Sequence, residues 1–229
     1  MLTLHPLCGD HAVLQCEKPL TIRGTAAPLA PVTVTLASAI VTTTADAHGR
    51  WSAPFPSQAA GGPHELVVEA AGEIRRCTDI HFGEVWLCSG QSNMEWTLGM
   101  LSGLEADIAA ASDPLLRCFT VARQPADEPA ATVTGLWLPT TPAHARDFSA
   151  TAYFFARRLR AATGRPVGIV VAAYGGSAID AWLSPPVLAS RPEYRVFTAR
   201  SVERPTAAED LTRFAPHPYE ARTPIADGW

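Results

Sequence analysis

Residues 85–94 read VWLCSGQSNM, an apolar run that leads directly into Gly90, Gln91, Ser92 and Asn93. A short apolar run bounded by glycine is typical of a buried strand. In open α/β sheets, ligands bind just beyond the carboxyl ends of the strands. Because Ser92 would lie at such an end, this stretch predicts an α/β fold with Ser92 as a candidate nucleophile.

A serine hydroxyl needs a neighbouring base to take its proton and donors to stabilise the oxyanion that forms. The Gly-x-Ser-x-Gly motif of the α/β-hydrolases is not present here, because Met94 occupies its last position. Serine is also a favoured helix N-cap, so capping the next helix is the structural alternative for Ser92. Its own N–H could serve an oxyanion in either case.

A second apolar run, residues 167–173, is unbroken and leads into Tyr174, Gly175 and Gly176. Such runs are typical of parallel strands that are covered on both faces. The glycines permit a tight turn, which is the structural interpretation. A glycine N–H can also approach a substrate oxygen to about 3 Å, so Gly176, or else Gly175, is a candidate oxyanion donor.

The chain from residue 85 onward alternates strands and helices, which is the pattern of an α/β domain. We expect strands from Val85, over 115–121 and over 167–173, and helices over 101–111 and 148–163, the last packing on the sheet. The segment 124–141 is expected to be a surface loop, and the chain after Ser184 to be irregular.

The first eighty residues predict an all-β unit. Short runs rich in Val, Thr and Ile recur between turn signals, at 20–23, 32–36, 40–44, 51–54, 65–69 and 74–80. This spacing favours a small β-sandwich. We therefore expect a β-sandwich domain at 1–80, part of an α/β domain at 81–190 and an irregular tail at 191–229.

Composition limits the classes of partner and cofactor. The 229 residues carry a formal charge of −4 without a run of cations, which argues against nucleic acid. No stretch has the ~20 apolar residues of a membrane span, and no leader precedes the first strand. As written, the chain is expected to be cytoplasmic. The histidines and cysteines show no metal-ligand spacing, so no metal is expected.

The five cysteines, Cys8, Cys16, Cys77, Cys88 and Cys118, are odd in number and form no Cys-x-x-Cys pair. Buried free thiols are the favoured interpretation, because cysteine behaves as a small hydrophobe. A disulfide between Cys8 and Cys16 is the alternative.

Residues 83–94, GEVWLCSGQSNM, closely resemble the nucleophile block of the sialate O-acetylesterase family, which belongs to the SGNH-type hydrolases. Residues 174–182, YGGSAIDAW, are similar to the family's Trp-Gly-Gly-Thr-Pro-Ile-Glu-Ala-Trp block, with mild changes at the Tyr, Ser, Ala and Asp positions. Further similarity extends over nearly the whole chain up to about Pro192. It includes residues 10–15, 24–26, 49–51, 61–63 and 148–156.

The resemblance implies a β-sandwich ahead of a flavodoxin-like SGNH hydrolase domain, and a serine esterase that needs no cofactor. It would remove O-acetyl groups from sialic acid or related sugars, with Ser92 as nucleophile and the N–H groups of Ser92 and Gly176 as oxyanion donors. Gln91, Asn93 and Ser177 are candidate substrate-binding residues, with bracing of the loop or turn as their alternative. Asp180 and Trp182 rank below them, and Trp182 is expected to be buried.

The resemblance also identifies what this chain lacks. The family's Gln-Gly-Glu segment and the Asp-x-x-His that carries the SGNH base are not found in the sequence. His217, in the predicted tail, is a weak substitute, and Glu84 and Glu95 are expected to be structural or to line the rim of the pocket. The chain therefore resembles the front portion of a longer enzyme, with weak or no activity of its own.

Two alternatives remain open from the sequence. The chain could be a non-catalytic fragment or carbohydrate-binding module that needs a partner chain for the missing His and Asp. A start site further upstream would add a signal peptide and make the protein periplasmic or secreted. The preferred sugar and the oligomeric state do not follow from the residues.

Overall fold

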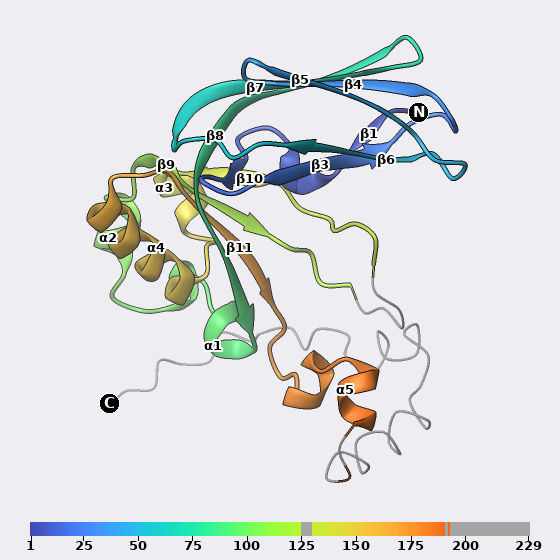
Figure 1. Cartoon of the computed structure of the whole chain (residues 1–229). Coiled ribbons are helices and arrows are strands. Elements are labelled where there is room, and N and C mark those ends of the chain that lie inside the picture. Colours follow the sequence, from blue (N-terminus) through green and yellow to red (C-terminus); the bar gives the residue numbers. More distant parts are fainter. Residues whose placement is uncertain (125–129, 191, 193–229) are drawn as a thin grey trace. The chain divides into compact units, whose positions relative to one another are not determined.

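The computed structural model describes residues 1–124, 130–190 and 192. The fold is mixed α/β, with a multi-stranded sheet and few helices (Figure 1). Its strands are β1 (Thr3–Leu4), β2 (Val13–Gln15), β3 (Leu20–Thr25), β4 (Pro31–Leu36), β5 (Ala39–Thr44), β6 (Arg50–Phe55), β7 (Gly61–Ala70), β8 (Glu73–Gly90), β9 (Asp113–Thr120), β10 (Trp137–Thr140) and β11 (Val167–Ala173). Its α-helices are α1 (Ser92–Glu95), α2 (Glu105–Ala109), α3 (Pro142–Ala145), α4 (Ala150–Thr163) and α5 (Pro185–Ala189).

The chain divides into two compact units, and each is described by itself. The first contains residues 1–123 and 131–177. The second contains residues 124–130 and 178–229, of which the structure describes 124, 130, 178–190 and 192. The predicted boundary between residues 80 and 81 falls inside the first unit and remains a prediction.

Strand β8 is the backbone element that organises the first unit. It is 18 residues long and runs without a break from its pairing with β7 to α1 (Figure 1). The sequence predicted two strands here, separated around Gly83, and that separation is wrong. Gly83 permits a close approach instead, since a Cβ at this position would lie 2.0 Å from the Pro166 carbonyl oxygen.

Strands β3 to β7 follow the expected positions to within a few residues, whereas β1 and β2 were not predicted. One sheet has the order β1-β3-β6, and β4, β5 and β7 extend the larger sheet from β8. Alternate side chains of β4 and β6 are buried, as the period of two requires. Both sheets contribute to one apolar core, which includes Ile22, Val34, Phe55 and Phe82.

The other part of the larger sheet has the order β10-β9-β11-β8, in which β9, β11 and β8 are parallel. A second core lies between these strands and α4, as expected for a helix that packs on a sheet. Ser149 caps α4, and Gly164, at φ 68°, ends it in the left-handed conformation. Strand β11 has the predicted range, 167–173. An unbroken apolar run is typical of a parallel strand that is covered on both faces.

Three predictions of local structure are corrected. The helix expected over 101–111 is confined to α2, because Gly103 is left-handed at φ 82°. The segment 124–141 is not all loop, since β10 pairs with β9, although residues 125–129 lie outside the description. The short helix α5 follows Ser184, and the predicted tail lies outside the described residues except for Pro192.

All five cysteines are free, so the alternative of a Cys8–Cys16 disulfide is wrong. Four of them are buried, and Cys77 is half-buried. Burial raises the pKa of the Cys118 thiol to about 12, as it does for Cys8. These thiols are therefore protonated at neutral pH and behave as small apolar side chains.

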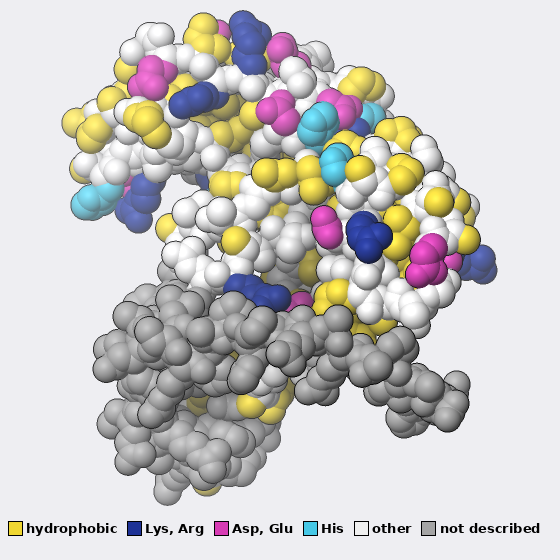
Figure 2. Space-filling model, turned by 180° about the vertical axis from the view of Figure 1, so that it is seen from behind, with side chains coloured by type: hydrophobic (Ala, Val, Ile, Leu, Met, Phe, Trp, Pro, Cys, Tyr) yellow, Lys and Arg dark blue, Asp and Glu magenta, His cyan; other side chains and the backbone are white. Residues whose placement is uncertain are grey.

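No helix among the described residues has the length and apolarity to cross a membrane. On the face seen in Figure 2, cationic and anionic side chains are interspersed rather than gathered by sign.

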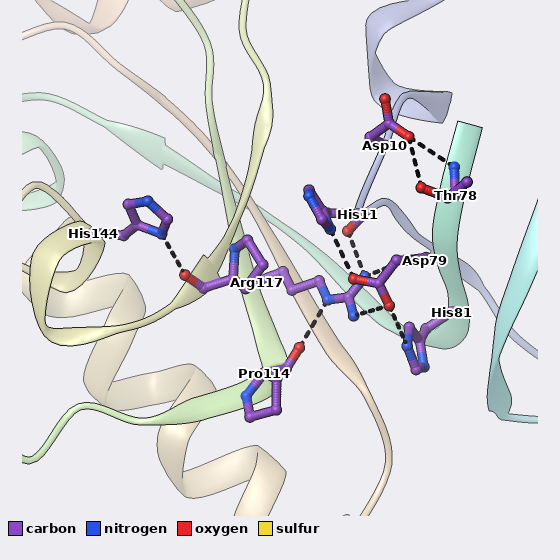
Figure 3. Close-up of polar contacts among 9 residues, drawn as sticks. Asp10, His11, Thr78, Asp79, His81, Pro114, Arg117 and His144 are labelled. Atoms are coloured by element: carbon purple, nitrogen blue, oxygen red, sulfur yellow. Dashed lines mark hydrogen bonds and ion pairs between the residues drawn. The ribbon is translucent and has the colours of Figure 1, made fainter. Parts of the chain in front are cut away.

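A buried arginine joins β9 to β8 and to the segment that precedes β2 (Figure 3). The Arg117 side chain is 2% exposed and its Nη2 pairs with Asp79 Oδ1 at 2.9 Å. Its other donors reach the carbonyl oxygens of His11, Asp79 and Pro114. The Asp79 carboxylate also contacts His11 Nδ1 at 2.7 Å and His81 Nε2 at 3.1 Å. A charge this deeply buried requires such a complete set of partners.

The network sets the direction of two pKa values. Burial alone raises the pKa of Asp79, but hydrogen bonds from His11 and Arg117, together with the Arg117 charge, outweigh it and hold the pKa below its ordinary value. Burial, reinforced by the Arg117 charge, lowers the pKa of His81. Because both pKa values are lowered by folding, both groups make the free energy of unfolding larger at neutral pH than at acid pH.

Replacing Asp79 with Asn should destabilise the protein by about 3 kcal/mol, because the Arg117 guanidinium would stay buried without a counter-charge. Asn tolerates the left-handed φ of 58° at this position, so backbone strain does not contribute. Urea unfolding measures the loss. The matched control is Glu65→Gln, which removes an exposed pair with Arg76 and should cost no more than about 1 kcal/mol. Equal losses in both variants would contradict the role of Asp79.

The free energy of unfolding should fall as the pH drops below the ordinary His81 value of 6.5, because the unfolded chain binds this proton more readily. The contribution is fully present above that pH and is lost as pH falls through the lowered folded-state pKa; it adds at most about 1.4 kcal/mol per pH unit. Urea unfolding from pH 8 to pH 5 measures the slope. His81→Gln should reduce it, and His48→Gln, in an exposed turn, should not.

Candidate active site

Two neighbouring parallel strands end at the same edge of the sheet and carry the candidate residues. Strand β11 pairs with β8 in a register that places Ala173 opposite Gly90. Ser92 follows β8 by two residues, and the Tyr174–Gly176 turn follows β11 directly. The Tyr174 N–H donates to the Gly90 carbonyl at 3.0 Å and so joins the two ends. A Cβ on Gly175 would lie 3.8 Å from Ser92 Cα.

Ser92 is half-buried, so its hydroxyl is not sealed in the interior. It is the first residue of α1, and the N-cap is Gln91 rather than Ser92, so the capping interpretation of Ser92 is wrong. Ser92 Oγ donates to Gln91 Oε1 at 3.0 Å, and the Ser92 N–H donates to the same oxygen at 3.3 Å. An amide oxygen is not a base at neutral pH, so this contact holds the hydroxyl without activating it.

Gln91 and Asn93 flank the serine and are both exposed. Gln91 braces the turn through its contacts with Ser92, as the structural alternative anticipated. The Asn93 carbonyl accepts a hydrogen bond from Thr151 Oγ1 at 2.8 Å, which ties the turn to the start of α4. The side chains of both residues therefore lie at the surface next to Ser92.

The two glycines differ in the state of their N–H groups. The Gly175 N–H donates to Glu95 Oε2 at 3.0 Å, so it is already occupied. No hydrogen bond of the Gly176 N–H is found in the part of the chain that the structure describes. Gly176 is exposed and left-handed at φ 79°, a conformation that favours glycine. Of the two, Gly176 has the N–H without a partner among the described residues, so it is the candidate to meet an incoming oxygen.

The Glu95 side chain lies against the Tyr174–Gly176 turn. Its side chain is 20% exposed, and Oε1 forms an ion pair with the Arg123 guanidinium without the alignment of a hydrogen bond. Arg123 also lies over the Tyr174 ring, 5.6 Å from its centroid. The sequence placed Glu95 in a structural or rim role but gave no signal for Arg123, which precedes the predicted loop.

The other predicted residues are placed as follows. Ser177 Oγ donates to the Tyr174 carbonyl at 2.7 Å and helps to close the turn. Asp180 and Trp182 belong to the second unit, in the 3-10 helix Ile179–Trp182. Trp182 is 42% exposed, so its predicted burial is wrong. Glu84 lies within β8, at the start of its pairing with β11 opposite Val167, and pairs with Arg165 at 3.1 Å, which makes it structural.

The histidines that form hydrogen bonds within the described residues do so away from Ser92. His5 accepts from the Leu7 N–H, His11 and His81 contact Asp79, and His144 contacts the Pro139 carbonyl. His217 lies outside the described residues. The site as described thus contains a candidate nucleophile and a candidate oxyanion donor, and no base is identified among the described residues.

A cavity of about 130 Å³ lies next to Glu95, between the ends of β9 and β11 and the segment 147–149. Polar residues line much of it, including Thr97, Thr120, Arg123 and Ser149. Ser92 does not line it, and its volume is below the roughly 300 Å³ of small ligand pockets. We therefore do not assign this cavity to the substrate.

Comparison with known proteins agrees with the geometry. Residues 82–208 match the model of a family described as carbohydrate esterase, sialic acid-specific acetylesterase. The chain is 31% identical over 195 residues to the sialate O-acetylesterase of Rattus norvegicus and 30% identical over 196 residues to that of Homo sapiens. These alignments cover 76% and 77% of this chain, but only 36% and 38% of the two relatives.

A solved structure is also similar. A carbohydrate acetylesterase from Xanthomonas citri superimposes with a TM-score of 0.80 and 41% sequence identity. The match covers 85% of this chain and 45% of that protein. The chain therefore spans less than half the length of each of these relatives.

Ser149 connects the start of α4 to α1, the short helix that begins at Ser92. It is buried, its Oγ accepts from the Ala152 N–H at 3.3 Å, and it donates to Met94 Sδ at 3.6 Å. Ser149→Ala should cost about 1 kcal/mol of stability through the lost cap, measured by urea unfolding. Ser52→Ala, at an exposed position of β6, is the control and should change stability by less than about 0.5 kcal/mol. Indistinguishable variants would show that the cap contributes nothing.

Proposed function

Since this chain belongs to the family of sialic acid-specific acetylesterases among the carbohydrate esterases, we propose that it hydrolyses O-acetyl esters of sialic acid or related sugars through Ser92. The observation that carries the proposal is the adjacency of the half-buried Ser92 and the Gly175–Gly176 turn at the carboxyl ends of β8 and β11. No metal or organic cofactor takes part in this reaction. The substrate is a small acetylated carbohydrate.

In the proposed reaction, Ser92 Oγ attacks the acetyl carbonyl carbon and forms a tetrahedral oxyanion. The bond to the sugar oxygen then breaks, and the sugar leaves as an alcohol with the proton that the serine gave up. Water attacks the acetyl-enzyme, which releases acetate and restores the Ser92 hydroxyl. Each half of the reaction needs a group that accepts and returns one proton.

The Gly176 N–H is the better supported oxyanion donor, because no described residue accepts a hydrogen bond from it. The Ser92 N–H is the second proposed donor. Its present hydrogen bond to Gln91 Oε1 is long, at 3.3 Å, so a carbonyl oxygen with developing charge could displace it. Gly175 is less suited than the sequence alone suggested, since Glu95 already accepts from its N–H.

We assign the rim of the site to Gln91, Asn93 and Ser177. The first two are exposed beside the serine, and Ser177 lies within the turn that carries Gly176. Their amide and hydroxyl groups suit the hydroxyls and the acetyl carbonyl of a sugar ester. Movement of the Gln91 side chain away from Ser92 would make both residues available to substrate.

For the fold, we propose an N-terminal β-sandwich followed by part of an SGNH hydrolase domain. Taking β8, β9 and β11 as the first three strands gives an order that differs from the 2-1-3 of flavodoxin-like sheets. The order agrees if β8 and β11 are the adjacent first and second strands and β9 is an added outer strand. The β8 residues 85–90 pair only with β11 among the described strands, which leaves a side for a further strand.

Without an identified base, the 229-residue chain is expected to be a weak esterase, several orders of magnitude below ordinary enzymes in rate. The retained rate comes from binding and the oxyanion donors. The second candidate function is a non-catalytic carbohydrate-binding fragment whose partner chain supplies the His and Asp. The observation that favours it is the hydrogen bond from Ser92 Oγ to an amide rather than to a base.

The test combines slow turnover of 4-nitrophenyl acetate with labelling by a fluorophosphonate. We expect low turnover and slow labelling at Ser92, both abolished in Ser92→Ala, because the Ser92 hydroxyl is the proposed nucleophile. Mass spectrometry of peptides locates the label. Ser89→Ala is the matched control, since Ser89 lies in β8 three residues before Ser92 and donates to the Ala172 carbonyl.

Other results would revise the proposal. Turnover at rates typical of enzymes, lost in Ser92→Ala, would contradict the expected weakness and indicate a base in the chain. Binding of O-acetyl sialic acid without any label would favour the carbohydrate-binding alternative.

A further inference from the structure

Glu95 is the last residue of α1, the helix that begins at Ser92, and its side chain accepts a hydrogen bond from the turn after β11. No other side chain of α1 forms such a bond among the described residues. The two carboxylate oxygens of Glu95 have different partners. Oε2 accepts from the Gly175 N–H at 3.0 Å, and Oε1 forms the ion pair with Arg123. The side chain therefore crosslinks the two loops on which the reaction depends.

The contact between Glu95 and Gly175 leaves no space for a side chain at position 175. A Cβ on Gly175 would lie 2.2 Å from Glu95 Oε2, so only glycine allows the carboxylate this close to the backbone. Gly175 has no left-handed φ, unlike Gly176. The requirement for glycine at position 175 thus comes from Glu95 and not from the turn itself.

The hydrogen bond also decides which N–H group remains available. Successive N–H groups at Gly175 and Gly176 could both face a substrate oxygen, but a carboxylate that accepts from Gly175 fixes the peptide plane of that residue. The next N–H, at Gly176, has no partner in the described chain. The Gly175 N–H is thus used to hold the turn, and the Gly176 N–H remains available to an oxyanion.

A carboxylate near a developing oxyanion would normally oppose catalysis by repulsion. Arg123 offsets that cost, because its guanidinium pairs with the other oxygen of Glu95 and lies over the Tyr174 ring. The pair is nearly neutral as a unit. Each oxygen of Glu95 has one of these partners, and no hydrogen bond between Glu95 and Ser92 is found among the described residues.

We propose that Glu95 is a positioning residue, which holds the Tyr174–Gly176 turn through the Gly175 N–H so that the Gly176 N–H is presented to the oxyanion. Arg123 keeps the carboxylate oriented and its charge balanced. This proposal rests on the proposed esterase function, because only an ester hydrolase of this kind needs the Gly176 N–H as an oxyanion donor. The contact itself does not depend on that function, so the two can fail separately.

The experiment measures amide exchange and chemical shifts of Gly175 and Gly176 by NMR in the full chain, with and without acetate as the probe. Wild type should show a protected Gly175 amide, and acetate should shift the Gly176 amide. Glu95→Ala should speed exchange at Gly175 by about tenfold or more and weaken acetate binding by a similar factor, because the acceptor is lost.

Glu95→Gln is the rescue variant, since its amide oxygen can still accept from the Gly175 N–H. It should keep Gly175 exchange and acetate binding within about threefold of wild type. Glu84→Gln is the matched control: it changes the same group in a pair with arginine at the other end of the β8–β11 pairing, and it should leave both glycine amides unchanged. A loss in Glu95→Gln as large as in Glu95→Ala would overturn the role of the acceptor.

The failures are distinguishable. If acetate does not shift Gly176 in wild type, the oxyanion assignment fails. If acetate does shift Gly176, but Glu95→Ala changes neither the Gly175 exchange nor the acetate affinity, the positioning role fails.

Should Glu95→Ala not fold, Gly175→Ala provides an independent measurement. The added methyl must displace the Glu95 carboxylate, so Gly175→Ala should shift the Arg123 and Gly176 signals and weaken acetate binding. In the Glu95→Gln background the same clash remains, and no rescue is expected. Unchanged Gly176 signals and acetate affinity in Gly175→Ala would overturn the proposal.

Discussion

The parallel pairing of β8 with β11 is the constraint on which the rest of the site depends. Its register sets Gly90 opposite Ala173, so the two strands end together and their following residues meet. Parallel strands cannot be joined by a tight hairpin, and the connection between these two includes β9, β10 and α4. The residues of the site are therefore distant in sequence but fixed in space by backbone hydrogen bonds. The second core, between α4 and the parallel strands, keeps this pairing in place.

The sequence predicted those features that depend on local pattern. Strand β11 was found at its full length because seven consecutive small or apolar residues are covered on both faces. Ser92 and Gly176 were singled out because both follow apolar runs, and parallel strands bring such positions to one edge. The family resemblance agreed with the chain's similarity to sialate O-acetylesterases. The assignment of roles to individual site residues remains a proposal.

Features that depend on distant contacts were missed for physical reasons. Gly83 suggested a break between two strands, whereas it accommodates the Pro166 carbonyl against a continuous β8. Strand β10 lies in a segment with few periodic signals, and its pairing with β9 comes from the partner strand. The occupied N–H of Gly175 could not be foreseen either, since it requires Glu95 and the turn to be neighbours in three dimensions. Likewise, nothing near Arg117 in the sequence indicates that Asp79 is its partner.

The uninterrupted β8 has a consequence for where this protein can be divided. A cut after residue 80, the boundary that composition suggests, would sever a strand that pairs with β7 on one side of the cut and with β11 on the other. Neither fragment would contain the whole of β8, and the part of the strand that leads to Ser92 would lose its connection to the part paired with β7. The amino-terminal strands are thus not a detachable appendage. An exchange of these strands for another module would therefore have to include the whole of β8.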